Sequence, residues 1–222
     1  MNTFMTKTLV IASHPNYQHS LSQRFFAESA KIPGVTLHFL DQLDQFILAD
    51  ELALLADCDR LILQFPLYWY SVPAKMKAWI DTIWTEAKPL LTGKEIGFAI
   101  STGVAAKEFQ LGGNEQISFN EILRPQLRMA QKYHMTVLPL IVLDQFMYKT
   151  ETQKRRFVVD YQQLLTMPYP FSFDQKQQWF ADRLHSLIEV KPQLAPLLTQ
   201  LEENRELIQD LDEALDSLEE SL

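Results

Sequence analysis

The sequence predicts an α/β protein in which a five-stranded parallel sheet carries helices on both faces, followed by a helical extension at the C-terminus. Short apolar runs rich in β-branched residues alternate with segments of helical periodicity over most of the chain. The apolar runs show no polar alternation, which is typical of parallel strands buried on both faces. With 222 residues, 47% hydrophobic and 22% charged, the composition is that of an ordinary soluble globular protein.

The first expected strand and helix illustrate the pattern. Lys7 to Ser13 (KTLVIAS) is a buried strand that ends at His14-Pro15-Asn16. Ser20 is a helix cap, followed by Leu21, Phe25 and Phe26 at helical spacing, and Pro33-Gly34 stops that helix.

The same alternation predicts the remaining elements. Further strands are expected at 35–40, 60–65, 96–100 and 136–143. Helices are expected at 49–56, at 73–84, around 117–132 with an interruption at Pro125, and near 151–165.

The C-terminal segment has a different pattern. We expect a main domain over 1–170, a connecting helix over 171–192 and an acidic heptad helix over 193–222. The last 22 residues hold nine acidic side chains against Arg205 alone. A narrow apolar stripe at alternating spacings of four and three favours a coiled coil that joins copies of the chain. The alternative is an amphipathic helix folded back on the body. The stripe consists of Leu197, Leu201, Asn204, Ile208, Leu211, Leu215, Leu218 and Leu222.

Charge and composition argue against several classes of protein. The net charge is −8, and residues 1–200 balance at zero, so no basic stripe for nucleic acid or an anionic membrane is present. No apolar run reaches the roughly 18 to 20 residues of a membrane span. The N-terminal apolar run is too short for a secretory signal, and the single Cys58 allows no intrachain disulfide, so we expect a cytoplasmic protein.

The candidate site follows from the expected sheet. In open α/β sheets, ligands bind beyond the carboxyl ends of the strands, which here selects the loops 13–20, 65–73 and 101–114. The six glycines fit neither the dinucleotide fingerprint nor the P-loop, and no nucleophile elbow or metal-ligand motif is present, so no metal site is predicted.

Two of these loops carry suggestive chemistry. Ser20 and Ser22 add hydroxyl groups to the free N–H groups at a helix start and could bind a phosphate, although taken alone the pattern favours Ser20 as only a cap. Tyr68, Trp69 and Tyr70 follow a buried strand that cannot cover all three rings. They predict a wall for a flat heteroaromatic ligand, a dimer interface, or both.

Two segments resemble a known family. The stretch Gln64 to Ala74 (QFPLYWYSVPA), running into Lys77 to Asp81, resembles the NAD(P)H:quinone oxidoreductase family of flavodoxin-like flavoproteins. The segment from Phe109 through Pro125 resembles its bacterial branch of general stress proteins and ancillary proteins of potassium efflux systems. The similarity spans about residues 7–170 and implies a flavodoxin-like three-layer sandwich.

The resemblance implies a non-covalent flavin, FMN by preference with FAD possible, and no catalytic residue of the chain's own. NAD(P)H and then a quinone would use one pocket, in a two-electron ping-pong hydride transfer through flavin N5. Phe109 and Tyr70 would contact the substrate. Phosphate contacts are expected from His14, Ser20, Leu21 and Ser22, and ring contacts from Pro66, Leu67, Tyr68, Trp69, Tyr70, Ser101, Thr102, Gly103 and Val104.

Three positions depart from the family pattern. Val104 stands where relatives often have a glycine, Phe109 where they have a tyrosine, and Asp144-Gln145 near a histidine-glycine pair. Val104 narrows the approach to the ring, and Phe109 cannot donate a hydrogen bond, which bears on substrate preference and turnover.

The resemblance also implies partners and an alternative function. The family forms homodimers across its flavin sites, and the tail predicts a higher homo-oligomer. The alternative to an enzyme is a flavin-bearing regulatory subunit of a potassium efflux transporter, with little turnover of its own. A flavodoxin-like electron carrier fits less well, because the aromatic residues and the 101–114 loop would cover the ring.

Overall fold

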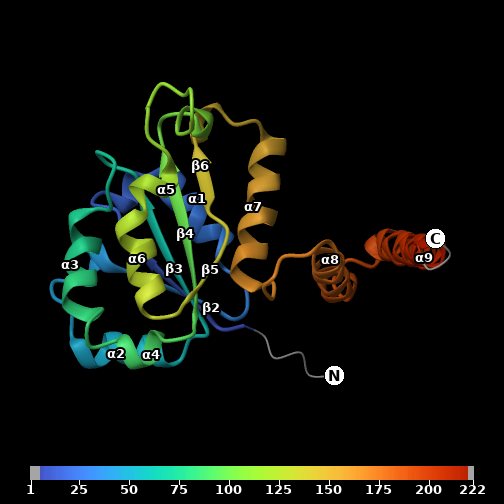
Figure 1. Cartoon of the computed structure of the whole chain (residues 1–222), viewed down its shortest axis with the longest axis horizontal. Helices are drawn as coiled ribbons and strands as arrows, with labels where there is room; N and C mark the ends of the chain where they lie inside the picture. The colour runs from blue at the N-terminus through green and yellow to red at the C-terminus, as the bar shows by residue number, and fades with distance from the viewer. Residues whose placement is uncertain (1–5, 220–222) are drawn as a thin grey trace. The chain divides into compact units, whose positions relative to one another are not determined.

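The computed structural model describes residues 6–219 and divides the chain into two compact units (Figure 1). The first unit ends at Thr166, and the second begins at Met167. Among the described residues, no helix combines the length and apolar character needed to cross a bilayer.

The first unit contains a parallel sheet with the strand order β2-β1-β3-β4-β5, and β6 also pairs with β4. This arrangement confirms the predicted flavodoxin-like fold. The strands of the sheet end at a common edge, since Ala12 aligns with Gln64 and Gln64 aligns with Ala99. The strands are β1 (Thr8–Ala12), β2 (Val35–Phe39), β3 (Arg60–Pro66), β4 (Glu95–Thr102), β5 (Thr136–Val137) and β6 (Ile141–Asp144).

The expected fifth strand is broken into two pieces. β5 pairs with the start of β4, and β6 pairs with its end. Pro139 lies between them and has no N–H group to donate to the ladder. The prediction of one strand over 136–143 was therefore wrong at Pro139, which interrupts the strand.

Helices cover both faces of the sheet (Figure 1). α1 (Leu21–Ser29) and α7 (Glu151–Thr166) pack together on one face, through ring contacts of Phe26 with Phe157 and Tyr161. The helices between β2 and β5 are α2 (Leu48–Ala56), α3 (Ala74–Ile83), α4 (Lys88–Leu91), α5 (Phe119–Ile122) and α6 (Arg124–Lys132). The expected helix at 117–132 is thus two helices, and Pro125 lies in the first turn of α6, where its missing N–H group is harmless.

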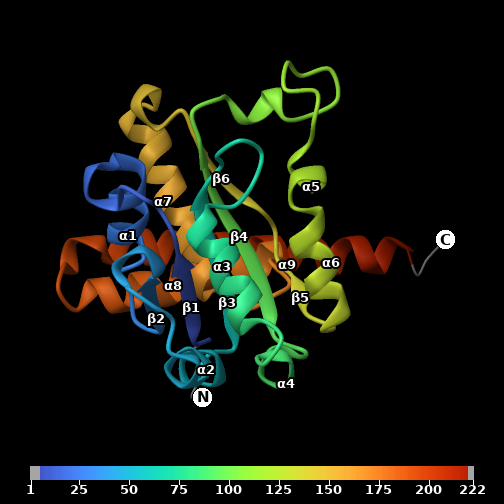
Figure 2. The same ribbon diagram turned by 90° about the vertical axis from the view of Figure 1, so that its left-hand side faces the viewer.

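The second unit is a helical hairpin (Figure 2). α8 (Phe173–Ile188) and α9 (Ala195–Glu219) pack along each other and are joined through the short helix η5 (Pro192–Leu194). Leu198 is buried, Leu201 and Ile208 are half-buried, and Leu211 and Leu215 are exposed. Leu222 lies outside the described residues, and the domain boundaries at 170 and 192 stay predictions.

A buried arginine anchors the amino ends of the central strands. Arg60 has 0% exposure, and its Nε donates to Glu95 Oε2 at 2.6 Å. Its Nη1 donates to the Leu164 carbonyl at the end of α7. One side chain therefore connects β3, β4 and α7.

We expect Arg60→Met to lower the free energy of unfolding by about 3 kcal/mol, because Glu95 and a backbone carbonyl lose their charged partner. Urea denaturation would measure the change. The control Arg156→Met, at an exposed position of α7, should change the value by less than about 0.5 kcal/mol. Equal effects of the two variants would contradict the assigned role of Arg60.

Candidate functional site

A cavity of about 420 Å³ lies at the carboxyl ends of the strands. It is built from the loops after β1, β3, β4 and β6, together with the start of α1. Its lining consists of His14, His19, Ser20, Leu21, Ser22, Pro66, Leu67, Tyr68, Ser101, Thr102, Gly103, Leu143, Gln145, Phe146, Met147 and Tyr148. Ten of the thirteen residues predicted to bind the cofactor thus line a single cavity.

One end of this cavity is the N-terminus of α1. Ser20 is the N-cap, and its Oγ accepts a hydrogen bond from Gln23 N at 3.4 Å, as the sequence predicted for a cap. The Ser20 and Ser22 hydroxyl oxygens are 3.2 Å apart. Hydroxyl groups and the positive end of a nine-residue helix together form a suitable environment for a phosphate.

His14 and Tyr68 form a pair on the cavity wall. His14 Nδ1 accepts a hydrogen bond from Asn16 N at 2.9 Å, and burial lowers the pKa of His14, an effect that Asp41 only partly offsets. The ring is therefore neutral near pH 7, with its proton on Nε2. Nε2 lies 3.1 Å from the Tyr68 hydroxyl, so it donates to that oxygen.

The direction of this hydrogen bond determines whether Tyr68 can act as a donor in the cavity. Burial raises the pKa of Tyr68, so the hydroxyl keeps its proton, and its oxygen already accepts from His14. The hydroxyl proton is left for a hydrogen-bond acceptor in the cavity. Both ring nitrogens of His14 are engaged in this structure, so the phosphate contact predicted for His14 stays a prediction.

A chain of buried polar side chains supports the cavity from below. Ser101 Oγ accepts from Gln23 Nε2 at 3.0 Å, and Gln23 Oε1 accepts from Gln64 Nε2 at 2.9 Å. Gln64 Oε1 in turn accepts from the Tyr161 hydroxyl at 2.7 Å, and burial raises the pKa of Tyr161. This series of hydrogen bonds connects α1, β3, β4 and α7, and it fixes the position of Ser101 at the cavity floor.

The aromatic residues do not form one continuous wall. Only Tyr68 of the three lines the cavity, whereas Trp69 is 94% exposed and Tyr70 donates to Glu115 Oε2 at 2.7 Å. Trp69 and Tyr70 have φ angles of 49° and 58°, a left-handed conformation that is rare for bulky residues. The turn is closed by the hydrogen bond from Ser71 N to Tyr68 O at 3.1 Å.

Two further predicted residues lie outside the cavity lining. Phe109 is 5% exposed and stacks on Phe119 at a centroid distance of 4.5 Å. Val104 is exposed, and its N–H donates to Thr102 Oγ1 at 3.2 Å. Their predicted contacts, like those of Trp69 and Tyr70, stay predictions.

One wall of the cavity lies outside the three loops predicted to form the site. The segment after β6, which includes the short helix η4 (Phe146–Tyr148), contributes Gln145, Phe146, Met147 and Tyr148. The rule that selected the other three loops applies equally to the loop after the last strand, so this wall could have been predicted. His19 lies next to Ser20 in the predicted loop 13–20, but no contact with a ligand was predicted for it.

Asp144 connects this wall to the loop after β4. Its Oδ1 lies 2.5 Å from Lys149 Nζ, and its Oδ2 accepts from Ala106 N at 3.0 Å. Burial raises the pKa of Asp144, but the hydrogen bonds from Lys149 and Ala106 outweigh this effect and hold the pKa below its usual range. Asp144 is therefore a charged tether between two loops of the site.

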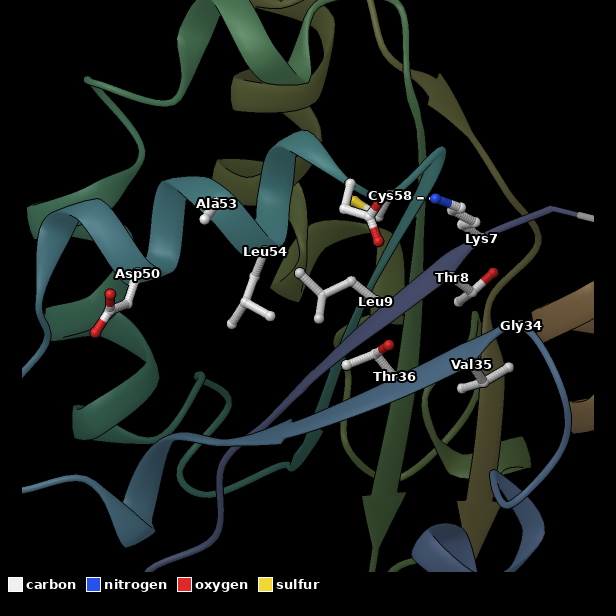
Figure 3. A pocket seen from close by; sticks show the side chains of 11 residues that line it. Lys7, Thr8, Leu9, Gly34, Val35, Thr36, Asp50, Ala53, Leu54 and Cys58 are labelled. Atoms are coloured by element: carbon white, nitrogen blue, oxygen red, sulfur yellow. Dashed lines mark hydrogen bonds and ion pairs between the residues drawn. The ribbon is translucent and has the colours of Figure 1, made fainter.

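A second cavity, of about 610 Å³, lies between β1, β2 and α2 (Figure 3). Its walls include the aliphatic side chains of Leu9, Val35 and Leu54, and the exposed Lys7–Asp57 ion pair, at 2.6 Å, lies among its lining residues. Cys58 borders it, but burial raises the pKa of this thiol, which makes it a poor nucleophile. Its lysine, Lys7, is already paired with Asp57, and the helix N-terminus with two serine hydroxyls lies at the first cavity instead.

Within residues 6–219, no group of three or more His, Cys, Asp and Glu side chains is placed to hold a metal ion.

Comparison with known proteins identifies the family of this chain. Residues 6–165 match the family described as having the flavodoxin-like fold. An uncharacterised NAD(P)H oxidoreductase of Bacillus subtilis, YrkL, is 36% identical over 143 residues, covering 60% of this chain and 82% of that protein. The potassium-efflux ancillary protein KefG of Cronobacter sakazakii is 34% identical over 149 residues, covering 61% of this chain and 80% of KefG.

Two solved structures resemble the chain. The NADPH-quinone reductase of P. pentosaceus has a TM-score of 0.68 and 38% identity, covering 72% of this chain and 98% of that chain. General stress protein 14 of Treponema denticola, solved in complex with FMN, has a TM-score of 0.64 and 27% identity, covering 72% of this chain and 97% of that chain.

The lowered pKa of His14 predicts a pH dependence of stability. In the folded protein the pKa lies below the ordinary value of 6.5, so the unfolded chain takes up the proton first as the pH falls. The stabilisation is complete above pH 6.5 and is lost as the pH falls from there through the folded pKa. Urea denaturation between pH 8 and pH 5 should show a smaller loss in His14→Gln than in the wild type.

The exposed His19 provides the control for this comparison. His19→Gln should lose stability with falling pH as the wild type does. A His14→Gln profile parallel to that of the wild type would contradict the assigned burial effect.

Proposed function

The chain belongs to the flavodoxin-like family, and from that premise we propose that it is an NAD(P)H oxidoreductase that binds FMN and reduces a quinone. The observation that carries the proposal is the arrangement of chemical groups around the 420 Å³ cavity. Groups suited to a phosphate lie at the start of α1, and hydrogen-bond donors and aromatic residues lie along the walls.

The donors present suit FMN. Ser20, Ser22 and the N-terminus of α1 would hold the phosphate without a basic side chain, since N–H groups and a helix dipole neutralise part of its charge. The volume falls within the range of about 300 to 1,000 Å³ that is usual for small-molecule sites. Leu67, Tyr68 and the loop from Ser101 to Gly103 would hold the flat ring system.

When bound, FMN would supply the redox chemistry, a two-electron ping-pong hydride transfer between NADH or NADPH and the quinone. The chain itself binds and orients the reactants. Tyr68 holds a hydroxyl proton toward the cavity because His14 occupies its acceptor site. Ser101 is held by Gln23, so its position does not depend on the ligand.

The exposed turn at Trp69 supports a second copy of the chain as a further partner of this site. Trp69 presents its ring to solvent at the expense of a left-handed backbone, and such strain is typical of functional sites. We propose that the ring is covered in a homodimer.

The alternative function is a flavin-bearing regulatory subunit of a transporter. Two observations favour it: the similarity to KefG, which is named an ancillary protein, and the second unit from Met167 onward, which lies outside the family match. Both functions require the same cofactor, so turnover distinguishes them.

The test combines cofactor identification with kinetics. The purified protein is denatured, and the released chromophore, identified by mass, should be FMN. Oxidation of NADH and NADPH is then followed with a simple quinone, where an enzyme should turn over at about 1 s⁻¹ or faster. FMN with a negligible rate would favour the regulatory function, and a protein that binds neither FMN nor FAD would refute both.

A larger side chain at Gly103 should block the cavity without disturbing the fold. A Cβ atom built on Gly103 meets no heavy atom within 4 Å. We expect Gly103→Leu to weaken FMN binding at least about tenfold, or 1.4 kcal/mol, because the side chain occupies the ring space. Fluorescence titration of the apoprotein with FMN measures the affinity.

Gln110→Leu is the control, since Gln110 is exposed, lies outside the cavity lining and is not predicted to contact the cofactor. Its FMN affinity should stay within about twofold of the wild type. If Gly103→Leu also bound FMN normally, the ring could not lie against the loop after β4.

A further inference from the structure

The α8–α9 hairpin has a second apolar face, besides the one that joins its two helices. On α8, Phe173, Phe180 and Leu187 recur every seven residues and are between 37% and 61% exposed. On α9, Leu197 and Leu211 belong to one heptad position, with the exposed Asn204 between them. A heptad repeat left at the surface on two neighbouring helices is unusual for a monomer.

These residues do not form the contact between α8 and α9. That contact uses the buried Ala181 of α8 and the buried Leu198 of α9, with half-buried neighbours one turn away. At about 100° per residue, each exposed stripe lies roughly a quarter turn from the packed face of its helix, in the same rotational sense. Because the helices run antiparallel, both stripes lie on one side of the hairpin.

The two outer edges of this face carry opposite charges. Lys176 and Arg183 lie about 60° around α8 from its stripe, and Glu203 and Asp210 lie about 100° around α9 from its stripe, each pair seven residues apart. These edges lie on opposite sides of the hairpin, so the charges of one edge cannot reach those of the other within one chain. The face therefore offers cations along one edge and anions along the other.

The register of the hairpin aligns these charges in height. His185 Nε2 lies 3.7 Å from Glu202 Oε1, so these two residues are level. Arg183 is two residues before His185 and is level with residue 204, next to Glu203. Lys176 is nine residues before His185 and is level with residue 211, next to Asp210.

We propose that this face binds the same face of a second copy, so that two hairpins form a four-helix bundle. A twofold axis parallel to the helices places each α8 on α9 of the partner, with the helices antiparallel. It brings Arg183 beside Glu203 of the partner subunit and Lys176 beside Asp210 of the partner subunit. The apolar stripes meet in the centre.

The charges select this arrangement and this partner. The other face-to-face twofold arrangement would place α9 on α9, and α9 contains eight acidic residues against Arg205. Like charges in contact oppose such a pairing. Pairing with a second copy requires the cations of one edge to lie at the same height as the anions of the other, as they do here. Binding to an unrelated protein would not require this match.

Two charge reversals in the full-length protein test the proposal. Arg183→Glu and Glu203→Arg each place like charges opposite each other twice in the dimer, so each should raise the dissociation constant about tenfold. An equimolar mixture of the two variants should form mixed dimers with near wild-type affinity, because every charge then meets its opposite. Analytical ultracentrifugation gives the affinities, and native mass spectrometry of differently tagged variants identifies the mixed species.

The mixture distinguishes a lost charge pair at this interface from a loss of folding, because a variant that had unfolded could not recover its affinity on mixing. Arg156→Glu, the same substitution on α7, should leave assembly unchanged. Three results would each overturn the proposal: a wild-type mass of 25.8 kDa, single variants that assemble like the wild type, or a mixture with no excess of mixed species. The last two would be expected if the first unit or another protein covers the face.

Discussion

The cavity depends on a single buried hydrogen-bond chain, from Ser101 through Gln23 and Gln64 to Tyr161. Buried amides and hydroxyls stabilise a fold only when their partners are present, and each member of this chain meets the next. The chain connects two strand ends to the helices on one face of the sheet. A displaced β4 would break it and move Ser101, so the geometry of the site is tied to the stability of the sheet.

The strands of the fold could be predicted where both of their faces are buried. β1 and β3 are buried along their whole length, and such continuous apolar runs leave little choice except a central parallel strand. The same reasoning located the loops after β1, β3 and β4. The loop after β6 follows the same rule about strand ends, but in the sequence only Asp144-Gln145 pointed to it, as a departure from the family pattern.

Contacts between distant residues were beyond the reach of the sequence. His14 and Tyr68 are 54 positions apart, and neither residue suggests the other. The direction of the Tyr68 proton follows only after Asn16 N is seen to occupy His14 Nδ1. Phe109 shows the converse: the family comparison suggested a lost hydrogen bond, yet the side chain is buried on Phe119, where a hydroxyl would need a new partner.

The turn at Trp69 and Tyr70 departs from the local conformational preference of its residues. Two consecutive left-handed residues are ordinarily glycine or asparagine, and each bulky residue in this conformation costs about 1 to 3 kcal/mol. Part of the compensation is visible in the hydrogen bond from Tyr70 to Glu115. Within residues 6–219, no packing covers the Trp69 ring, which is 94% accessible. This uncompensated strain is the physical reason for proposing that a second copy of the chain covers the ring.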